Sequence, residues 1–266
     1  MEPDAFARGE AILAARYAAV YDPGVLSRAA HLAGSDDRRA HELARALEDP
    51  EVRAVFCARG GYGALRIVDR LAAPGHKPVV GFSDITVLHA WLFGHALTSV
   101  HGPNVGGLGR DDARDQALWG LLENPDPPAP LSGLRPLRGG RADGRLLGGN
   151  LTVLSHLCGT RHFPDLRGAV LLLEDCNEQP YRIDRMLTQL GLSGSLAQLA
   201  GIALGDFSDC GDTKPVLEER LAALDVPVVA GLPVGHGDQN VALPHGARVR
   251  LDADAGVLEF LEGAVS

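Results

Sequence analysis

Hydrophobic and polar positions follow two different periods along the first half of the chain. Residues 6–20 and 36–50 carry apolar side chains at three- and four-residue spacing, which is typical of amphipathic helices. Residues 52–60 and 77–83 are short apolar runs, and residues 62–72 between them again have helical spacing. Because helices and strands alternate, this half predicts a parallel sheet with helices on its faces.

The pattern changes after a proline-rich stretch at residues 124–138, which cannot continue a helix and has the composition of a linker. We therefore predict an α/β domain over residues 1–124, a linker over 125–140 and a second domain over 141–266. Several short β-like runs with few long helices predict that the second domain is smaller and β-rich, and they include residues 168–175, 226–232, 247–253 and 257–262.

The composition fits a globular protein without a membrane or nucleic-acid partner. Of 266 residues, 45% are hydrophobic, which excludes disordered and collagen-like chains. The net charge is −9 and the basic residues are scattered, so no nucleic-acid footprint is visible. The N-terminus lacks the features of a secretory signal, and no stretch approaches ~20 uninterrupted apolar residues. We expect a cytoplasmic protein.

No metal or disulfide site is predicted. The four cysteines lie far apart without a C-x-x-C pair, so neither a disulfide framework nor structural zinc is expected. Four histidines also lack a spacing typical of metal ligands: His89, His95, His101 and His156.

Ser83 is the strongest candidate for a nucleophile. The apolar run KPVVGF delivers it into the start of an amphipathic helix, where its hydroxyl lies near free backbone N–H groups. Glu174 ends the apolar run GAVLLLED, and His236 follows the apolar segment GLPVG. Each residue alone has an ordinary interpretation: a helix cap, a paired or solvated carboxylate, and a loop histidine. Together they supply the three groups that serine catalysis requires.

The order Ser–Glu–His matches α/β-hydrolases, but GFSDI lacks the final glycine of their G-x-S-x-G motif. Six ordered motifs instead resemble the LD-carboxypeptidase family, also called muramoyltetrapeptide carboxypeptidases. They cover almost the whole chain: ARGGYG (58–63), GFSDIT (81–86), HGP (101–103), GGNL (148–151), LEDCNEQPYRIDRMLTQL (173–190) and PVGHGDQNVALPHG (233–246).

The resemblance implies a cytoplasmic serine peptidase of murein recycling that acts without metal or cofactor. It would remove the terminal D-alanine from a muropeptide stem by cutting after the L-centre of the diamino acid. Family members typically have a Rossmann-like N-terminal domain and a β-rich C-terminal domain, and they are commonly homodimers. The resemblance assigns the nucleophile to Ser83, the triad acid to Glu174 and the base to His236. It places the oxyanion donors at the backbone N–H groups of Gly61 and Asp84.

Substrate-binding residues are less specific in sequence. A carboxypeptidase pairs a free terminal carboxylate, and an arginine would serve, with a solvated or structural arginine as the alternative. Gly60 allows close backbone approach, and Asn150 either contacts substrate or caps the following helix. The arginine candidates are Arg59, Arg182 and Arg185.

Two alternatives and one departure from the family pattern accompany this interpretation. Family members usually begin with an apolar strand ahead of the segment that here starts at Met1, so we expect the first strand of the family fold to be missing.

A microcin C-type self-immunity peptidase would share the fold and triad but cleave acyl-nucleotides, and it would need an aromatic side chain to stack a base. Trp91 and Trp119 lie in helix-like segments and look like packing residues. A non-catalytic muropeptide-binding module is the second alternative.

Overall fold

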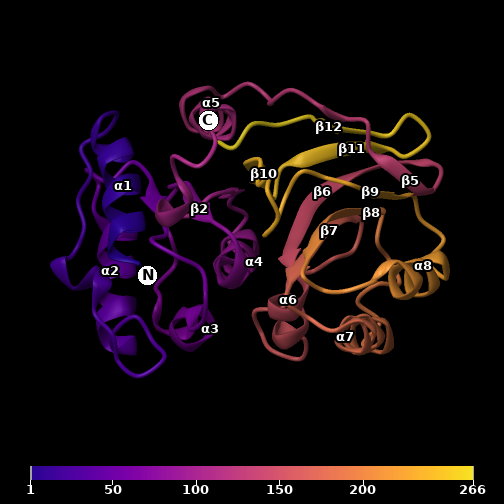
Figure 1. Ribbon diagram of the computed structural model, residues 1–266, viewed down its shortest axis with the longest axis horizontal. Helices are drawn as coiled ribbons and strands as arrows, with labels where there is room; N and C mark the ends of the chain where they lie inside the picture. Colours follow the sequence, from indigo (N-terminus) through magenta and orange to yellow (C-terminus); the bar gives the residue numbers. More distant parts are fainter. Residues whose placement is uncertain (1, 266) are drawn as a thin grey trace.

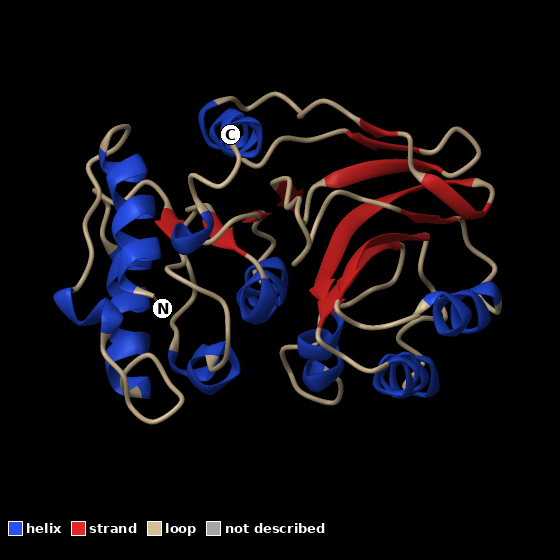
Figure 2. Cartoon of the chain, viewed as in Figure 1, coloured by secondary structure: helices blue, strands red, loops and turns tan. Residues whose placement is uncertain are grey.

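Two β-sheets with helices packed beside them make up the molecule (Figures 1 and 2). The computed structural model describes residues 2–265. A four-stranded sheet with the order β1-β2-β3-β10 lies in the N-terminal part, and an eight-stranded sheet with the order β4-β12-β11-β6-β7-β8-β9-β5 lies in the C-terminal part. The predicted α/β class, with a Rossmann-like N-terminal part and a β-rich C-terminal part, is confirmed.

The small sheet is parallel in its first three strands, as the alternating pattern predicts. β1 (Val55–Phe56), β2 (Val79–Gly81) and β3 (Ser99–His101) run parallel, and β10 (Leu243–His245) joins β3 antiparallel. The accompanying helices are α1 (Pro3–Ala14), η1 (Pro23–Leu26), α2 (Asp36–Glu48), α3 (Ala64–Ile67), η2 (Val68–Arg70), η3 (Ser83–Ile85), α4 (Thr86–Gly94), η4 (Val105–Gly107) and α5 (Asp112–Glu123).

The large sheet has a parallel centre and antiparallel flanks. β6 (Arg141–Asn150), β7 (Ala169–Cys176), β8 (Gly201–Ser208) and β9 (Val228–Ala230) run parallel to one another. Helices α6 (Leu151–Leu157), α7 (Pro180–Leu192) and α8 (Lys214–Ala222) lie along one side of this sheet (Figure 1). The flanking strands are β4 (Leu131–Ser132), β5 (Arg135–Arg138), β11 (Arg248–Asp252) and β12 (Val257–Phe260).

Residues 125–140, predicted as a linker, contribute strands to the large sheet. β4 pairs with β12, and β5 pairs with β9, so this stretch forms both outer strands. Proline is compatible with such edge positions because one side of an edge strand needs no ladder partner. The chain later returns to the small sheet through β10. The chain therefore passes between the two sheets three times, from β3 to β4, from β9 to β10 and from β10 to β11, and the domain limits stay a prediction.

β1 is an outer strand of the small sheet. The expectation that the first strand of the family fold is missing concerns positions outside the described residues and stays a prediction. The described sheet begins at β1, whose backbone is paired with β2 on one side.

β7 is buried along almost its whole length. Leu171, Leu172 and Leu173 have 0% exposure because apolar residues pack on both faces of the sheet. Burial of one leucine side chain contributes about 1.5–3 kcal/mol, so this strand is firmly fixed. Its next residue, Glu174, is also 0% exposed. A rigid apolar strand thus carries a carboxylate into the interior.

Three buried histidines meet where the two sheets join. His89 on α4 stacks on His245 of β10, with ring centroids 4.9 Å apart, and lies 5.9 Å from the ring of His101 on β3. Burial lowers the pKa of His89 to about 4 and that of His101 to about 3, and it also lowers the pKa of His245. Both ring nitrogens of His101 lack a hydrogen-bond partner within residues 2–265. Burial therefore favours the neutral form of all three rings in the folded protein.

This cluster predicts a loss of stability in mild acid. The pKa of an unfolded histidine is near 6.5, and the folded values lie below it, so below pH 6.5 the unfolded chain binds the extra protons. Stability is then lost as the pH falls from about 6.5 toward the folded pKa. Replacing His101→Phe should reduce the drop in unfolding free energy between about pH 7.5 and pH 5 by roughly 2 kcal/mol.

Urea denaturation at both pH values measures this difference. The matched control is His76→Phe, at an exposed loop position, which should leave the pH dependence at its wild-type value. An unchanged pH dependence in His101→Phe would show that the buried cluster does not control acid stability.

Candidate active site

The turn between β2 and α4 places Ser83 in a strained conformation. β2 ends at Gly81, and Ser83 has a φ of 68°, in the left-handed region that serine rarely adopts. Such a residue costs of order 1–3 kcal/mol and persists only where its surroundings enforce it. Ser83 is the first residue of η3, and α4 follows directly. This strand-to-helix turn presents the serine hydroxyl at the carboxyl end of β2.

Two side chains from the C-terminal part meet that hydroxyl. Nδ1 of His236 lies 2.7 Å from Oε2 of Glu174, and Nε2 lies 3.1 Å from Oγ of Ser83. Because a carboxylate only accepts, Nδ1–H donates to Glu174 and leaves Nε2 to accept the serine proton. The three residues that the sequence singled out are therefore joined in one hydrogen-bonded chain.

The electrostatics of the pair favour a charged imidazole. Burial lowers the pKa of His236, but contacts with Cys176 and Glu174 outweigh this and raise the pKa to about 10. Glu174 is completely buried, which raises its pKa, while the contact with His236 opposes this rise, so the carboxylate depends on His236 for its charge. The arrangement therefore stabilises the imidazolium form of His236.

Glycines bring the backbone close to these side chains. A Cβ on Gly60 would lie 2.7 Å from Cβ of Ser83, and a Cβ on Gly235 would lie 2.9 Å from Oε2 of Glu174. Gly61 and Gly235 have φ values of 101° and 126°, which favour glycine. Within residues 2–265 the N–H of Gly61 donates no hydrogen bond to the protein. Gly60 thus packs directly against Ser83, and the backbone N–H of the neighbouring Gly61 is free to donate a hydrogen bond to a ligand.

The side chain of Asp84 ties the serine turn to the glycine loop. Its Oδ2 accepts a hydrogen bond from the N–H of Ala64 at 2.8 Å. Burial raises the pKa of Asp84, partly offset by this bond. The contact orients the loop that contains Gly61 relative to Ser83.

Comparison with known proteins covers nearly the whole chain. The LD-carboxypeptidase N-terminal domain matches residues 1–102, and the LD-carboxypeptidase C-terminal domain matches residues 143–251. Together these matches span more than half of the sequence. The chain belongs to the LD-carboxypeptidase family.

Individual relatives of this LD-carboxypeptidase family member agree with the assignment. A protein of Synechocystis sp. is 43% identical over 258 residues, covering 92% of this chain and 85% of its own length. The murein tetrapeptide carboxypeptidase of Pseudomonas aeruginosa is 37% identical, with 86% and 82% covered. The crystal structure of muramoyltetrapeptide carboxypeptidase from Oxalobacter formigenes has a TM-score of 0.89 and 31% identity, with 100% and 97% covered. MccF bound to glutamyl sulfamoyl guanosine has a TM-score of 0.86 at 21% identity, covering 98% and 92%, and shows the fold alone.

Asn150 of this LD-carboxypeptidase family member has a structural role. Its Oδ1 accepts from the N–H of Val153 at 3.0 Å, which caps α6, and its Nδ2 donates to Asp175 at 3.0 Å. The residue is 5% exposed. The capping interpretation is therefore the one that the geometry supports, and the polar atoms of Asn150 are already used by the protein.

The three candidate arginines differ in their surroundings. Arg59 is exposed beside Gly60 and makes no ion pair or hydrogen bond within the described part of the chain. Arg182 pairs with Glu178 at 3.3 Å, and Arg185 lies over the ring of Tyr181 at 5.3 Å. Only Arg59 is both adjacent to the glycine loop and unpaired.

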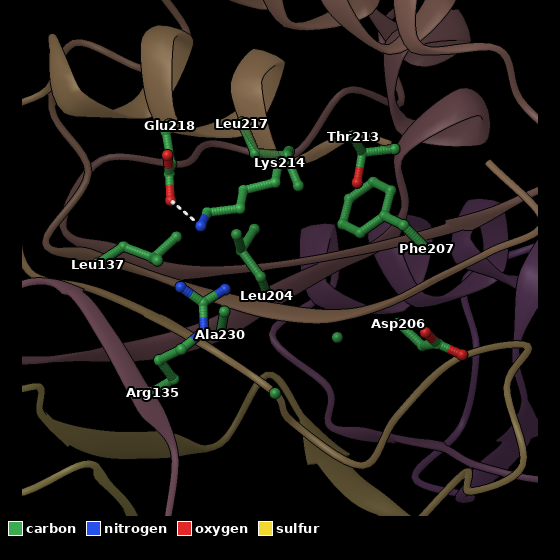
Figure 3. Close-up of a pocket in the computed structure, with 12 residues that line it drawn as sticks. Arg135, Leu137, Leu204, Asp206, Phe207, Thr213, Lys214, Leu217, Glu218 and Ala230 are labelled. Atoms are coloured by element: carbon green, nitrogen blue, oxygen red, sulfur yellow. Dashed lines mark ion pairs between the residues drawn. The ribbon is translucent and has the colours of Figure 1, made fainter. Parts of the chain in front are cut away.

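A cavity of about 250 Å³ lies in the C-terminal part (Figure 3). Its walls include Leu204 and Leu217, and on the α8 side of it Lys214 pairs with Glu218, one helical turn later, at 3.9 Å. None of the three hydrogen-bonded site residues lines it. Asp206, at its edge, packs so closely on the loop after His236 that a Cβ on Gly237 would lie 1.7 Å from its Oδ2.

Sequence reasoning missed two neighbours of His236. The ring of Phe82 lies 4.8 Å from the imidazole, centroid to centroid, and Cys176 contacts the same side chain. Cys176 stands two residues after Glu174 in β7, so strand periodicity could have placed both near one face. Phe82 carried no signal beyond its position next to Ser83.

No helix within residues 2–265 combines the length and the apolar character needed to cross a bilayer.

The close packing of Gly60 predicts the effect of adding one methyl group. Gly60→Ala would push Cβ into Ser83, and a displacement near 1 Å can cost about 100-fold in rate. We expect labelling of Ser83 by a fluorophosphonate to slow by about that factor while the thermal unfolding temperature changes little. Gly94→Ala, with no atom within 4 Å of the new Cβ, is the control and should label at the wild-type rate. Equal labelling of both variants would exclude the proposed contact.

Proposed function

We propose that this chain is a serine LD-carboxypeptidase of cytoplasmic murein recycling. It would hydrolyse the bond between the L-centre of the diamino acid and the terminal D-alanine of murein tetrapeptides. The observation that carries the proposal is the chain of hydrogen bonds from Glu174 through His236 to Ser83, at 2.7 and 3.1 Å. The 37% identity to a murein tetrapeptide carboxypeptidase supports the substrate class.

The geometry supports nucleophilic catalysis in two steps. Oγ of Ser83 attacks the carbonyl carbon while Nε2 of His236 takes its proton, and Glu174 stabilises the resulting imidazolium. His236 then gives this proton to the departing amine of D-alanine, which leaves an acyl-serine. Water attacks the acyl-serine with His236 again as base, and the shortened peptide leaves with Ser83 restored. No step needs a metal ion or cofactor.

Backbone donors complete the site in this proposal. The oxyanion of each tetrahedral intermediate would accept from the N–H groups of Gly61 and Asp84. Asp84 follows the nucleophile directly, and the Asp84–Ala64 hydrogen bond holds the glycine loop against it. One such donor typically contributes a factor of about 10²–10³ in turnover.

Arg59 is our candidate for the terminal carboxylate of the substrate. It is exposed, unpaired within the described residues and next to the glycine loop. Arg182 and Arg185 already contact Glu178 and Tyr181. A homodimer, suggested by family resemblance, belongs to the same proposal and is tested by light scattering on the purified protein.

Two other functions are less well supported. MccF shares the fold, but its 21% identity is below the 31% of the muramoyltetrapeptide carboxypeptidase structure. Trp91 and Trp119 are 6% and 4% exposed, so neither offers a free ring for a nucleobase. A non-catalytic binding module would not require the three polar groups to lie within hydrogen-bonding distance of one another.

Replacing Ser83→Ala should abolish hydrolysis without unfolding the protein. The purified chain is incubated with the tetrapeptide L-Ala, D-Glu, diamino acid, D-Ala, and the products are measured by mass spectrometry. We expect wild type alone to release one alanine, because Ser83→Ala lacks the attacking oxygen. Alanine release by the variant would contradict the triad. Cleavage of an aminoacyl-nucleotide analogue instead of the tetrapeptide would favour the microcin-type function.

Replacing Arg59→Ala should weaken substrate capture. A hydrogen bond to a charged group is worth about 1.5–3 kcal/mol, so we expect kcat/KM to fall roughly 10- to 100-fold, mostly through KM. The matched control is Arg182→Ala, which removes an exposed arginine already paired with Glu178. A larger effect in the control than in Arg59→Ala would move the carboxylate site to α7.

A further inference from the structure

A column of aromatic rings runs from the junction of the sheets to the imidazole of His236. Its last member before His236 is Phe82, with ring centroids 4.8 Å apart and planes at 54°. Behind Phe82 lies His101 at 6.0 Å, and the column continues through His89 at 5.9 Å to His245 at 4.9 Å. The column therefore connects the imidazole to three buried side chains on β3, α4 and β10.

The backbone around His236 has little regular structure. Residues 231–242 contain neither helix nor strand, and individual hydrogen bonds hold this loop in place. The N–H of Asp206 donates to the carbonyl of Val234 at 2.9 Å, and the N–H of Gly235 donates to Oδ1 of Asn240 at 3.2 Å. These contacts fix the loop on either side of the imidazole, but they do not fix the tilt of the ring.

Glu174 alone also leaves that tilt open. The imidazole is attached through Cβ, so its tilt changes through small rotations about χ1 and χ2 or small shifts of the loop backbone, and one hydrogen bond of 2.7 Å at Nδ1 tolerates such changes. Such a rotation would carry Nε2 away from Oγ of Ser83. A surface against the ring is needed to limit it, and Phe82 is the aromatic side chain that contacts the imidazole.

We propose that Phe82 is a positioning residue for His236, holding the imidazole at the tilt in which Nε2 faces Ser83. This inference rests on the proposed function. Phe82 has no polar side-chain atom and takes no part in proton transfer. Because it directly precedes Ser83, one backbone turn places both the nucleophile and the surface that aligns its base. The buried ring of His101 supports Phe82 from behind by packing.

Replacing Phe82→Leu should separate positioning from binding. The side chain stays apolar, but the flat surface against His236 is lost. We expect kcat to fall about 10- to 100-fold, as for a small misplacement of a reacting group, with KM within about 2-fold of wild type. The rate of fluorophosphonate labelling of Ser83 should fall by a similar factor. Phe82→Tyr keeps the ring and should restore most of both rates.

Phe93→Leu is the matched control for losing an aromatic ring elsewhere. Phe93 is a partly buried ring on α4 that packs against the core and is outside the column. Its variant should keep wild-type kcat and labelling rate. If Phe82→Leu does not fold, His101→Ala provides the second test, because removing the support behind Phe82 should also lower kcat with little change in KM, whereas His101→Phe should not.

The outcomes distinguish this inference from the function on which it rests. Wild-type kcat and labelling in Phe82→Leu, with Ser83→Ala inactive, would overturn the positioning role and leave the carboxypeptidase intact. An equal loss in Phe82→Leu and Phe82→Tyr would also overturn it, because the ring would then not be the feature that matters. Fluorophosphonate labelling needs no muropeptide, so the inference is tested even if the substrate assignment fails.

Discussion

The buried carboxylate of Glu174 is the constraint on which the site depends. A charge with no exposure to water is costly unless it is paired, and removing the partner of such a buried pair typically costs about 3–5 kcal/mol. His236 supplies that partner at 2.7 Å. The buried apolar side chains of β7 hold the strand that carries this carboxylate. Gly235 leaves room for the carboxylate, because a Cβ at position 235 would lie only 2.9 Å from Oε2. The position of the histidine is thus dictated by electrostatics as well as by packing.

The site also requires both sheets to be in place. Ser83 follows β2 of the small sheet, whereas Glu174 belongs to β7 of the large one. The loop with His236 starts after β9 in the large sheet and ends at β10 in the small sheet. Relative movement of the sheets would therefore change the distance from Nε2 to Oγ. The N–H of Gly148 on β6 donates to Nε2 of the buried His245 on β10 at 3.2 Å, and this hydrogen bond, which needs an unprotonated Nε2, links the two sheets.

Much of this arrangement could be predicted from residue patterns. The alternation of helical and β-like segments predicts the parallel strands β1 and β2, and the polar residues that end apolar runs predict Ser83 and Glu174 as site candidates. The strands β4 and β5 escaped prediction because proline and glycine signal a linker, while edge strands accept them. β10 joins the small sheet by pairing with β3, which is distant in sequence, and no local sequence pattern signals such a pairing. Phe82 acts through a contact with a residue far away in sequence, so periodicity could not identify it.

The central claim is that the charge of Glu174 makes His236 the base for Ser83. The most direct measurement is the rate of fluorophosphonate labelling of Ser83 as a function of pH, in wild type and in Glu174→Gln. Only neutral His236 accepts the serine proton, and contacts with Cys176 and Glu174 raise its pKa, so the wild-type rate should rise with pH along a limb above pH 6.5. In Glu174→Gln the labelling should be slower. The limb should also move to lower pH, because burial still lowers the pKa of His236 while the contact that raises it is weakened. A limb at the same pH in both proteins would contradict the account.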